Sequence, residues 1–202
     1  MTHTAVNFEH LIGRVQGLSE KQLRAHFELY QGYVKKLNEI EEKIKSADRS
    51  KANYSYSEIS ELQRRRPVAF NGAYLHQLYF ENLTGEVTNP GAELAAAINT
   101  NFGSMESWLE EAQAALKTAN GWALLTCSRI DGSLQTCVLE EHHHGLFIEQ
   151  DILMVVDGWE HAFMIDYGIK KADYYKAIQA SLDWTIASKR FHNAQGAAKI
   201  AA

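Results

Sequence analysis

The chain has 202 residues, of which 46% are hydrophobic and 22% charged, and this composition is typical of a folded globular protein. Its formal net charge of -5 argues against a strongly basic domain, so we expect no nucleic-acid partner. The sequence contains no apolar run long enough to cross a bilayer, and the segment Met1 to Leu11 lacks the basic and apolar regions of a signal peptide. The two cysteines form no CxxC pair. We therefore expect a cytoplasmic protein without a membrane partner.

Helical patterns dominate the first part of the chain. Ser19 followed by Gln22 is typical of a capping box, and apolar and aromatic residues then recur at helical spacing. This pattern predicts a helix that runs to about Lys45. Two further helices are predicted, one near 57–65 and one over 68–80.

The clearest interruption of these patterns is the segment 84–90, TGEVTNP. Its glycine, proline and polar residues are typical of a connection between structural units. We therefore predict two domains, one over residues 1–88 and one over residues 89–202. The second domain is expected to begin with helices near 91–99 and 104–118.

Strand patterns follow in the last third of the chain. The segments 122–128 and 134–139 are expected to pair as a hairpin, because an Asp-Gly turn lies between them. A continuous apolar run over 152–156 predicts a third strand, and a final helix is predicted over 173–191. Helices followed by helices with a small antiparallel sheet indicate an α+β fold.

An aspartate and a histidine flank the turn after the third predicted strand. Asp157 ends the apolar run, and His161 closes the segment DGWEH. Carboxylate and imidazole groups that converge at such a turn are a ligand pair for iron, manganese or zinc. The simpler alternative, which this pattern taken alone favours, is a helix-capping aspartate beside an ordinary histidine.

Two more histidines lie on predicted helices. His26, Tyr30 and Tyr33 share one face of the first helix, because their spacing returns to nearly the same direction. The usual explanation of such a stripe is an amphipathic core face with a hydrogen-bonded histidine. His76 lies among apolar residues, where a metal ion or, more simply, a backbone carbonyl would satisfy a buried imidazole.

Other polar clusters have simpler explanations. His142, His143 and His144 follow the second predicted strand and suggest a metal cluster, but adjacent histidines in a loop are usually solvated. At most one or two of them can point at a common site. The runs 64–66 and 170–171 are expected to be solvated surface charge.

Three segments together resemble the iron/manganese superoxide dismutases over nearly the whole chain. The most specific is 157–167, DGWEHAFMIDY, which is similar to the family signature D-x-W-E-H-A with a tyrosine after it. The segment 76–80, HQLYF, resembles the family's histidine with its apolar and aromatic tail. The segment 33–38, YVKKLN, resembles the end of the family's first helix, Y-V-x-x-L-N.

The resemblance implies both a fold and an activity. The fold is an N-terminal long α-hairpin domain followed by a C-terminal α/β domain with a three-stranded antiparallel sheet. The activity is the disproportionation of superoxide to oxygen and hydrogen peroxide by an enzyme that cycles one iron or manganese ion per subunit. The implied metal ligands are His26, His76, Asp157 and His161.

The same resemblance implies roles for residues around the metal. Tyr33 resembles the family's gateway tyrosine, and His142 falls where the family places a glutamine or histidine that hydrogen-bonds the metal-bound solvent. Trp122 and Trp159 would line the site. Because superoxide is an anion and the chain is acidic, local cations must attract it, and Lys171 is the leading candidate.

Resemblance also implies a homodimer. Glu160 would reach His161 of the partner subunit and fix the tautomer of that imidazole. Tyr30 stands where the family usually has a second histidine, and Met164 stands where it often has a tyrosine. In the family these two positions contact each other across the dimer, so their joint replacement suggests a repacked gateway.

Three other functions remain open to the sequence. The first is a metal-binding paralogue of the same fold without dismutase activity. The second is a structural or interaction protein that uses the fold without a metal. The third is a zinc hydrolase, which the ligand set permits but which lacks an evident general base.

Overall fold

The computed structural model describes residues 2–118 and 120–201, with side chains described as far as residue 196. The helices within these residues are, in chain order, η1 (Glu9–Leu11), α1 (Glu20–Ser46), η2 (Arg49–Lys51), α2 (Glu58–Glu81), α3 (Ala92–Phe102), α4 (Met105–Thr118), η3 (Glu160–Ala162), α5 (Met164–Tyr167), α6 (Lys171–Gln179) and α7 (Trp184–Ala201). The strands are β1 (Trp122–Ser128), β2 (Leu134–Leu139) and β3 (Gln150–Asp157).

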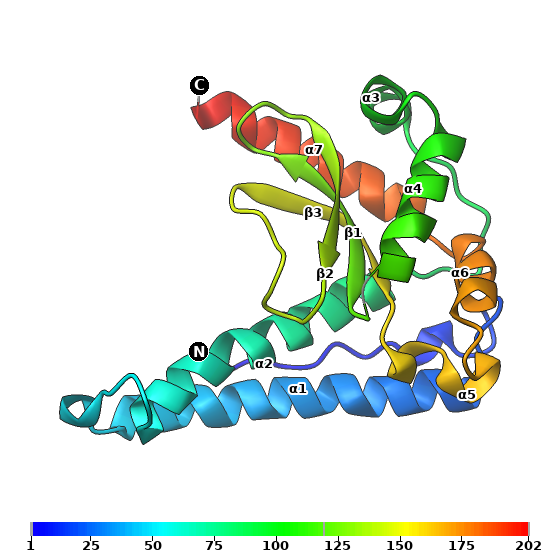
Figure 1. Ribbon diagram of the computed structural model, residues 1–202. Coiled ribbons are helices and arrows are strands. Elements are labelled where there is room, and N and C mark those ends of the chain that lie inside the picture. The colour runs from blue at the N-terminus through cyan, green and yellow to red at the C-terminus, as the bar shows by residue number, and fades with distance from the viewer. Residues whose placement is uncertain (1, 119, 202) are drawn as a thin grey trace.

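The helices α1 and α2 form a long antiparallel hairpin along one side of the molecule (Figure 1). The first of them begins as predicted, because the Ser19 hydroxyl accepts a hydrogen bond from the Gln22 N–H at 3.1 Å. The Gln22 side chain does not close a capping box. Instead, Asp166 accepts hydrogen bonds from the Ser19 N–H and hydroxyl, at 2.7 and 2.6 Å.

The helix α2 is continuous, and the prediction of two helices over 57–65 and 68–80 was wrong. Pro67 lies inside α2 in a solvent-exposed stretch. Proline removes one helical hydrogen bond, but here the helix is held on both sides by its packing against α1. Tertiary contacts thus outweigh the local cost of the proline.

The sheet has the predicted antiparallel pairing, in the order β2-β1-β3. At one end of the sheet, Trp122 is paired with Leu139 on one side and with Asp157 on the other. The helix α4 packs against β1 and β2, whereas α7 and α2 pack against β3. The architecture is the expected α+β arrangement of a helical hairpin followed by helices around a three-stranded antiparallel sheet (Figure 1).

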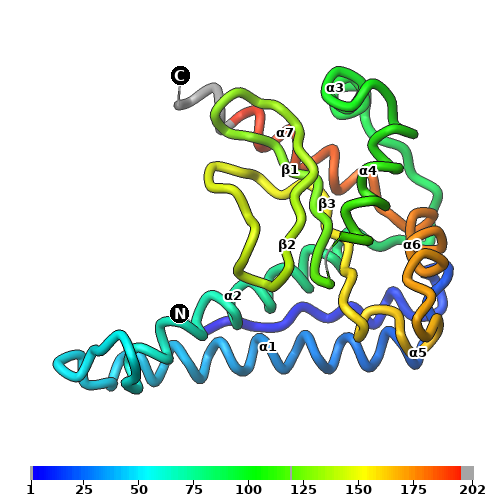
Figure 2. The backbone as a smooth tube through the Cα atoms, viewed as in Figure 1, coloured from blue at the N-terminus to red at the C-terminus, as the bar shows by residue number. Residues whose placement is uncertain are grey.

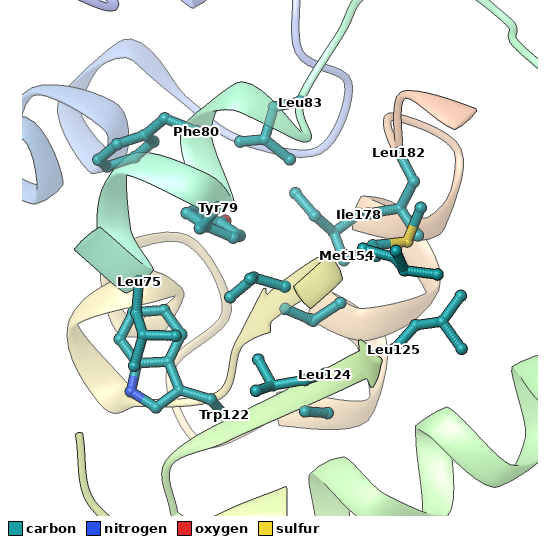
Figure 3. Packing of buried hydrophobic residues seen from close by; sticks show 14 of the residues in the cluster. Leu75, Tyr79, Phe80, Leu83, Trp122, Leu124, Leu125, Met154, Ile178 and Leu182 are labelled. Atoms are coloured by element: carbon teal, nitrogen blue, oxygen red, sulfur yellow. The ribbon is translucent and has the colours of Figure 1, made fainter. Parts of the chain in front are cut away.

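Buried side chains join the second helix of the hairpin to the sheet. Figure 3 shows Leu75 of α2 on the side of Trp122 of β1, with Tyr79 and Phe80 farther along α2 and Leu124 farther along β1. All five side chains are at most 3% exposed. Burial of this much aromatic and aliphatic surface fixes how α2 lies on the sheet, and therefore fixes the face of α2 that the sheet covers.

The last predicted helix is divided in two, so the prediction of one helix over 173–191 was also wrong. Between α6 and α7 the chain pairs with the segment that follows α2: the Thr84 N–H donates to the Ser181 carbonyl at 2.9 Å. The Asp183 N–H donates to the Asn82 carbonyl at 2.7 Å. These long-range bonds stop α6, and the Asp183 carboxylate then accepts from the Thr185 N–H at the start of α7.

The N-terminal segment runs beside the hairpin before the chain enters η1 (Figure 2). The His3 N–H donates to the Asn38 side chain at 2.8 Å, and the Val6 N–H donates to the Tyr30 hydroxyl at 3.0 Å. Tyr30 is 1% exposed as a result. Among the described residues, no helix has the length and hydropathy needed to span a bilayer.

Candidate metal centre

Four side chains from distant segments converge below the end of the sheet. Asp157 Oδ2 lies 3.2 Å from His26 Nε2, 3.2 Å from His161 Nε2 and 3.6 Å from His76 Nε2. The Nε2 atoms of His76 and His161 are 3.2 Å apart. One ligand atom from each of the four residues lies within 4.8 Å of every other, which defines the inner cluster.

Each member of the inner cluster is positioned by a different element. His26 belongs to α1, His76 to α2, Asp157 to the end of β3 and His161 to η3. The turn between the last two requires Gly158, because an added Cβ there would lie 2.6 Å from the Gly121 carbonyl oxygen. The Asp157 Oδ1 atom accepts the Trp159 N–H at 2.8 Å, which orients the carboxylate toward the histidines.

The inner cluster is almost completely buried. His26, His76 and Asp157 are each at most 1% exposed. Burial lowers the pKa of His26 and lowers the pKa of His76 to about 3. Burial also pushes the pKa of Asp157 upward, but the charge and hydrogen bond of His161 and the bond from His26 hold it below its ordinary range. The neutral imidazoles of His26 and His76 thus face a carboxylate anion.

This donor set fits a bound cation. The His76 Nδ1–H donates to the Gly72 carbonyl at 2.5 Å, so the Nε2 atom of the neutral ring carries a lone pair. That lone pair faces His161 Nε2 and the Asp157 carboxylate. A metal ion with bonds of about 2.0–2.2 Å to each donor turns this repulsion into coordination.

A second set of hydrogen bonds lies directly against the inner cluster. The Trp122 indole N–H donates to His142 Nδ1 at 3.0 Å, so in the neutral ring His142 Nε2–H donates to the Tyr33 hydroxyl at 2.6 Å. The Tyr33 ring stacks on His76 with centroids 5.2 Å apart. Burial lowers the pKa of His142 and raises the pKa of Tyr33, so both groups are neutral near pH 7.

Two supporting residues on α2 were given no role by the sequence. An added Cβ at Gly72 would lie 2.5 Å from the Tyr33 ring, so glycine is what lets this ring approach the helix. Asn71 donates to the backbone carbonyl of His142 at 2.7 Å. A glycine one helical turn before a candidate ligand histidine is the signal that would have identified Gly72.

Two further residues hold the segment that carries Asp157 and His161. The Gln22 amide donates to the His161 carbonyl at 2.6 Å and accepts the Ile165 N–H at 3.1 Å. The Tyr174 hydroxyl donates to the Asp157 carbonyl at 2.9 Å. Sequence reasoning treated Gln22 only as a capping residue and gave Tyr174 no role, because these contacts span long stretches of chain.

Trp159 and Lys171, which were also predicted to act at the site, lie at the edge of the inner cluster. Trp159 is parallel to His161, with ring centroids 6.3 Å apart, and 5.6 Å from His142. Lys171 is half-buried. Its Nζ lies close to Gly158, 3.0 Å from the point that a Cβ added to this glycine would occupy. Burial lowers the pKa of Lys171, while the charges of Glu160 and Asp157 raise it.

The predicted dimer residues divide between surface and interior. Glu160 is exposed, and the side chain of His161 is 28% exposed. Met164, which follows them, is 49% exposed. Tyr30 is buried within the chain, against Phe8 and Phe80, with its hydroxyl bonded to the N-terminal segment.

Three imidazoles and one carboxylate around a single buried point form a donor set that suits one transition-metal ion. Comparison with known proteins identifies the class of this protein. The profile "Iron/manganese superoxide dismutases, C-terminal domain" matches residues 90–190. The chain is similar to the superoxide dismutase [Fe] of Aquifex pyrophilus, with 36% identity over 188 residues, or 91% of this chain and 88% of the relative.

Relatives named for either metal are found. The superoxide dismutase [Fe] of Cupriavidus metallidurans is 36% identical over 88% of this chain and 90% of its own length. The superoxide dismutase [Mn] 2 of Haloferax volcanii is 33% identical over 88% of each chain. The chain belongs to the iron/manganese superoxide dismutase family. It is therefore an enzyme that disproportionates superoxide with one iron or manganese ion per subunit.

Proposed function

We propose that the inner cluster is where this chain carries out superoxide disproportionation, with His26, His76, Asp157 and His161 as the metal ligands. The observation that carries the proposal is the convergence of these four buried donors on one point. A bound iron or manganese ion supplies reversible one-electron transfer, which zinc, having no redox chemistry, does not. The balanced reaction joins two superoxide anions and two protons into one oxygen and one hydrogen peroxide.

The protons that peroxide formation consumes must reach a buried site. We assign this task to Tyr33 and His142. Because the His142 Nε2–H donates to the Tyr33 oxygen, the Tyr33 O–H remains free to donate to a substrate bound beside the stacked His76 ring. Trp122 holds His142 in this tautomer, and Trp159 covers His161 on the outer side. Tyr33 is partly exposed, so it connects this hydrogen-bonded chain with solvent.

Attraction of the substrate needs local positive charge, since the chain as a whole carries -5. We propose Lys171 for this role because its ammonium lies beside Gly158, next to the ligand Asp157. Charge reversal by Lys171→Glu is expected to lower kcat/KM and to weaken its dependence on salt. A salt dependence identical to that of the wild type would rule out steering by Lys171.

A homodimer is the assembly that best suits the exposed side of the site. We propose that Glu160 of each subunit accepts a hydrogen bond from the ligand His161 of the other subunit. His161 is more exposed than the other ligands, and Met164, Ile165 and Ile169, which follow it in the chain, are 49%, 44% and 91% exposed. An exposed apolar surface around a metal ligand is well suited to coverage by a second copy. Tyr30, buried here, would act on that interface only through the N-terminal segment.

We propose that the chain is divided into two domains, over residues 1–88 and 89–202. The profile match that begins at residue 90 supports this division. We also propose a cytoplasmic location, without a nucleic-acid or membrane partner. Cys127 and Cys137 are buried free thiols, and such thiols are typical of a reducing compartment.

The experiment that tests the function measures metal content and superoxide turnover on one sample of the enzyme. About one iron or manganese per chain together with turnover is the expected result. His161→Ala is expected to lose both the bound metal and turnover. His192→Ala is expected to keep both, because the His192 imidazole is exposed at the surface. Full metal content without turnover in the wild type would favour the inactive paralogue, and metal retained by His161→Ala would overturn the ligand assignment.

A further inference from the structure

A second group of ligating side chains lies on the turn that follows β2. The segment Glu141 to His144 is a four-residue turn, in which the His144 N–H donates to the Glu141 carbonyl at 3.4 Å. The turn therefore places the side chains of its first and last residues next to each other. His142, between them, is 6% exposed and points inward to Tyr33 and Trp122.

The other three side chains of the turn gather on its outer side and define the outer cluster: Glu141, His143 and His144. One ligand atom from each lies within 4.8 Å of the others. The rings of His143 and His144 are 3.9 Å apart between centroids and inclined by 33°. Two imidazoles and one carboxylate at this spacing are a common set of protein ligands for zinc.

One atom of the outer cluster is in an environment that a cation would improve. His143 Nδ1 is buried and has no hydrogen-bond partner among the described residues. It lies 3.7 Å from Glu141 Oε2, which is too far for a hydrogen bond. The same separation is what two ligands of one ion show when each bond is about 2.0–2.2 Å long. A buried polar nitrogen without a partner is costly, and a shared cation removes that cost.

The outer cluster also has an entry path for an ion. A depression of about 460 Å³, lined by Glu140, Glu141, His144 and Lys117, gives water and ions access to the ligands. Two carboxylates and one ammonium leave its rim with an excess of negative charge, which attracts divalent cations. Solvent can fill the coordination position that the three side chains leave open.

We propose that Glu141, His143 and His144 bind a divalent transition-metal ion, of which zinc is the representative, at a site separate from the iron or manganese centre. The separation follows from the direction of His142, which the turn sends to the inner cluster while its neighbours face outward. The outer ion does not take part in electron transfer.

The test uses the holoenzyme, with its iron or manganese in place, dialysed against zinc chloride. Zinc, iron and manganese are then measured on the same protein by mass spectrometry. We expect one additional zinc per chain, with the iron or manganese content unchanged. We expect His144→Ala and Glu141→Gln to weaken zinc binding by at least about tenfold while they keep their iron or manganese.

A matched control is available elsewhere on the surface. His192 lies 3.6 Å from Glu93, but both side chains are more than 70% exposed, and His192→Ala is expected to bind zinc like the wild type. The proposal is overturned if the wild type takes up no additional zinc. It is equally overturned if zinc enters only by displacing iron or manganese, or if His144→Ala binds zinc as tightly as the wild type.

Discussion

The inner cluster and the outer cluster offer similar ligand atoms but are built in opposite ways. The candidate ligands of the inner cluster come from four elements, and His26 and Asp157 are 131 residues apart in the chain. The outer ligands come from one four-residue turn. The inner cluster is buried, whereas in the outer cluster Glu141 and His144 are exposed.

This difference determines how each cluster affects the stability of the folded protein. The inner cluster brings together three imidazoles and a carboxylate, most of them buried, so metal binding and folding stabilise each other. In the outer cluster, water can satisfy most polar atoms when no ion is bound. Loss of an inner ligand should therefore affect metal, activity and stability together, and loss of an outer ligand should affect only zinc binding.

The largest effect is expected from Asp157→Asn. The substitution removes the anionic ligand of the inner cluster and leaves neutral donors around a cation. Iron or manganese content and superoxide turnover should each fall by at least about tenfold, as measured by metal analysis and activity of one preparation. Glu141→Gln, the same change in the outer cluster, is the control and should retain both. Equal effects of the two substitutions would remove the distinction between the clusters.

Acidification should destabilise the metal-free protein strongly. Because the pKa of His76 is lowered from 6.5 to about 3 in the folded chain, the unfolded chain binds a proton in this window that the folded chain does not. Stability therefore rises with pH between these values and is lost as the pH falls. One such histidine lowers the melting temperature by about 3–5 °C per pH unit.

The contribution of His76 to this pH dependence can be isolated. His76→Gln has no titrating group, so the slope of melting temperature against pH between 3 and 6.5 should decrease in the metal-free protein. His192→Gln, at an exposed position, should keep the wild-type slope. A slope unchanged in His76→Gln would show that its burial in the inner cluster does not govern acid stability.

Gly72→Ala is expected to have an intermediate effect. The added Cβ would lie 2.5 Å from the Tyr33 ring, so the ring must move away from His76. Thermal unfolding should show a loss of about 1–3 kcal/mol, and turnover should fall while metal content stays near the wild-type value. Gly32→Ala on α1, where nothing lies within 4 Å, is the control and should stabilise the protein slightly. Unchanged turnover in Gly72→Ala would argue against the role of Tyr33.

The smallest effect is expected from Glu141→Gln on stability. Because Glu141 is exposed, the substitution should change the free energy of unfolding of the zinc-free holoenzyme by no more than about 0.5 kcal/mol. The shift in melting temperature measures this change. Addition of zinc should raise the melting temperature of the wild type more than that of Glu141→Gln. A large destabilisation without zinc would mean that the turn itself, rather than an ion, requires this carboxylate.

Much of this molecule follows from local patterns. The start of α1 at Ser19 and the three strands were predicted close to their observed bounds, because capping residues, hairpin turns and short apolar runs act over a few residues. The four members of the inner cluster were found through the resemblance of short motifs. The supporting residues Gln22 and Tyr174 were not found in this way, because they gain their roles from contacts that no local pattern contains.

The sequence by itself determined the ligand types, the strand pairing and the family, since these depend on residue chemistry at short spacing. Only the tertiary structure decided that α2 continues through Pro67 and that α6 ends where Ser181 pairs with Thr84. It also decided that His142 faces inward while His143 and His144 face outward. The physical reason is that packing and long-range hydrogen bonds outweigh local propensities, which differ by about 1 kcal/mol or less for most residues and by about 3 kcal/mol for proline.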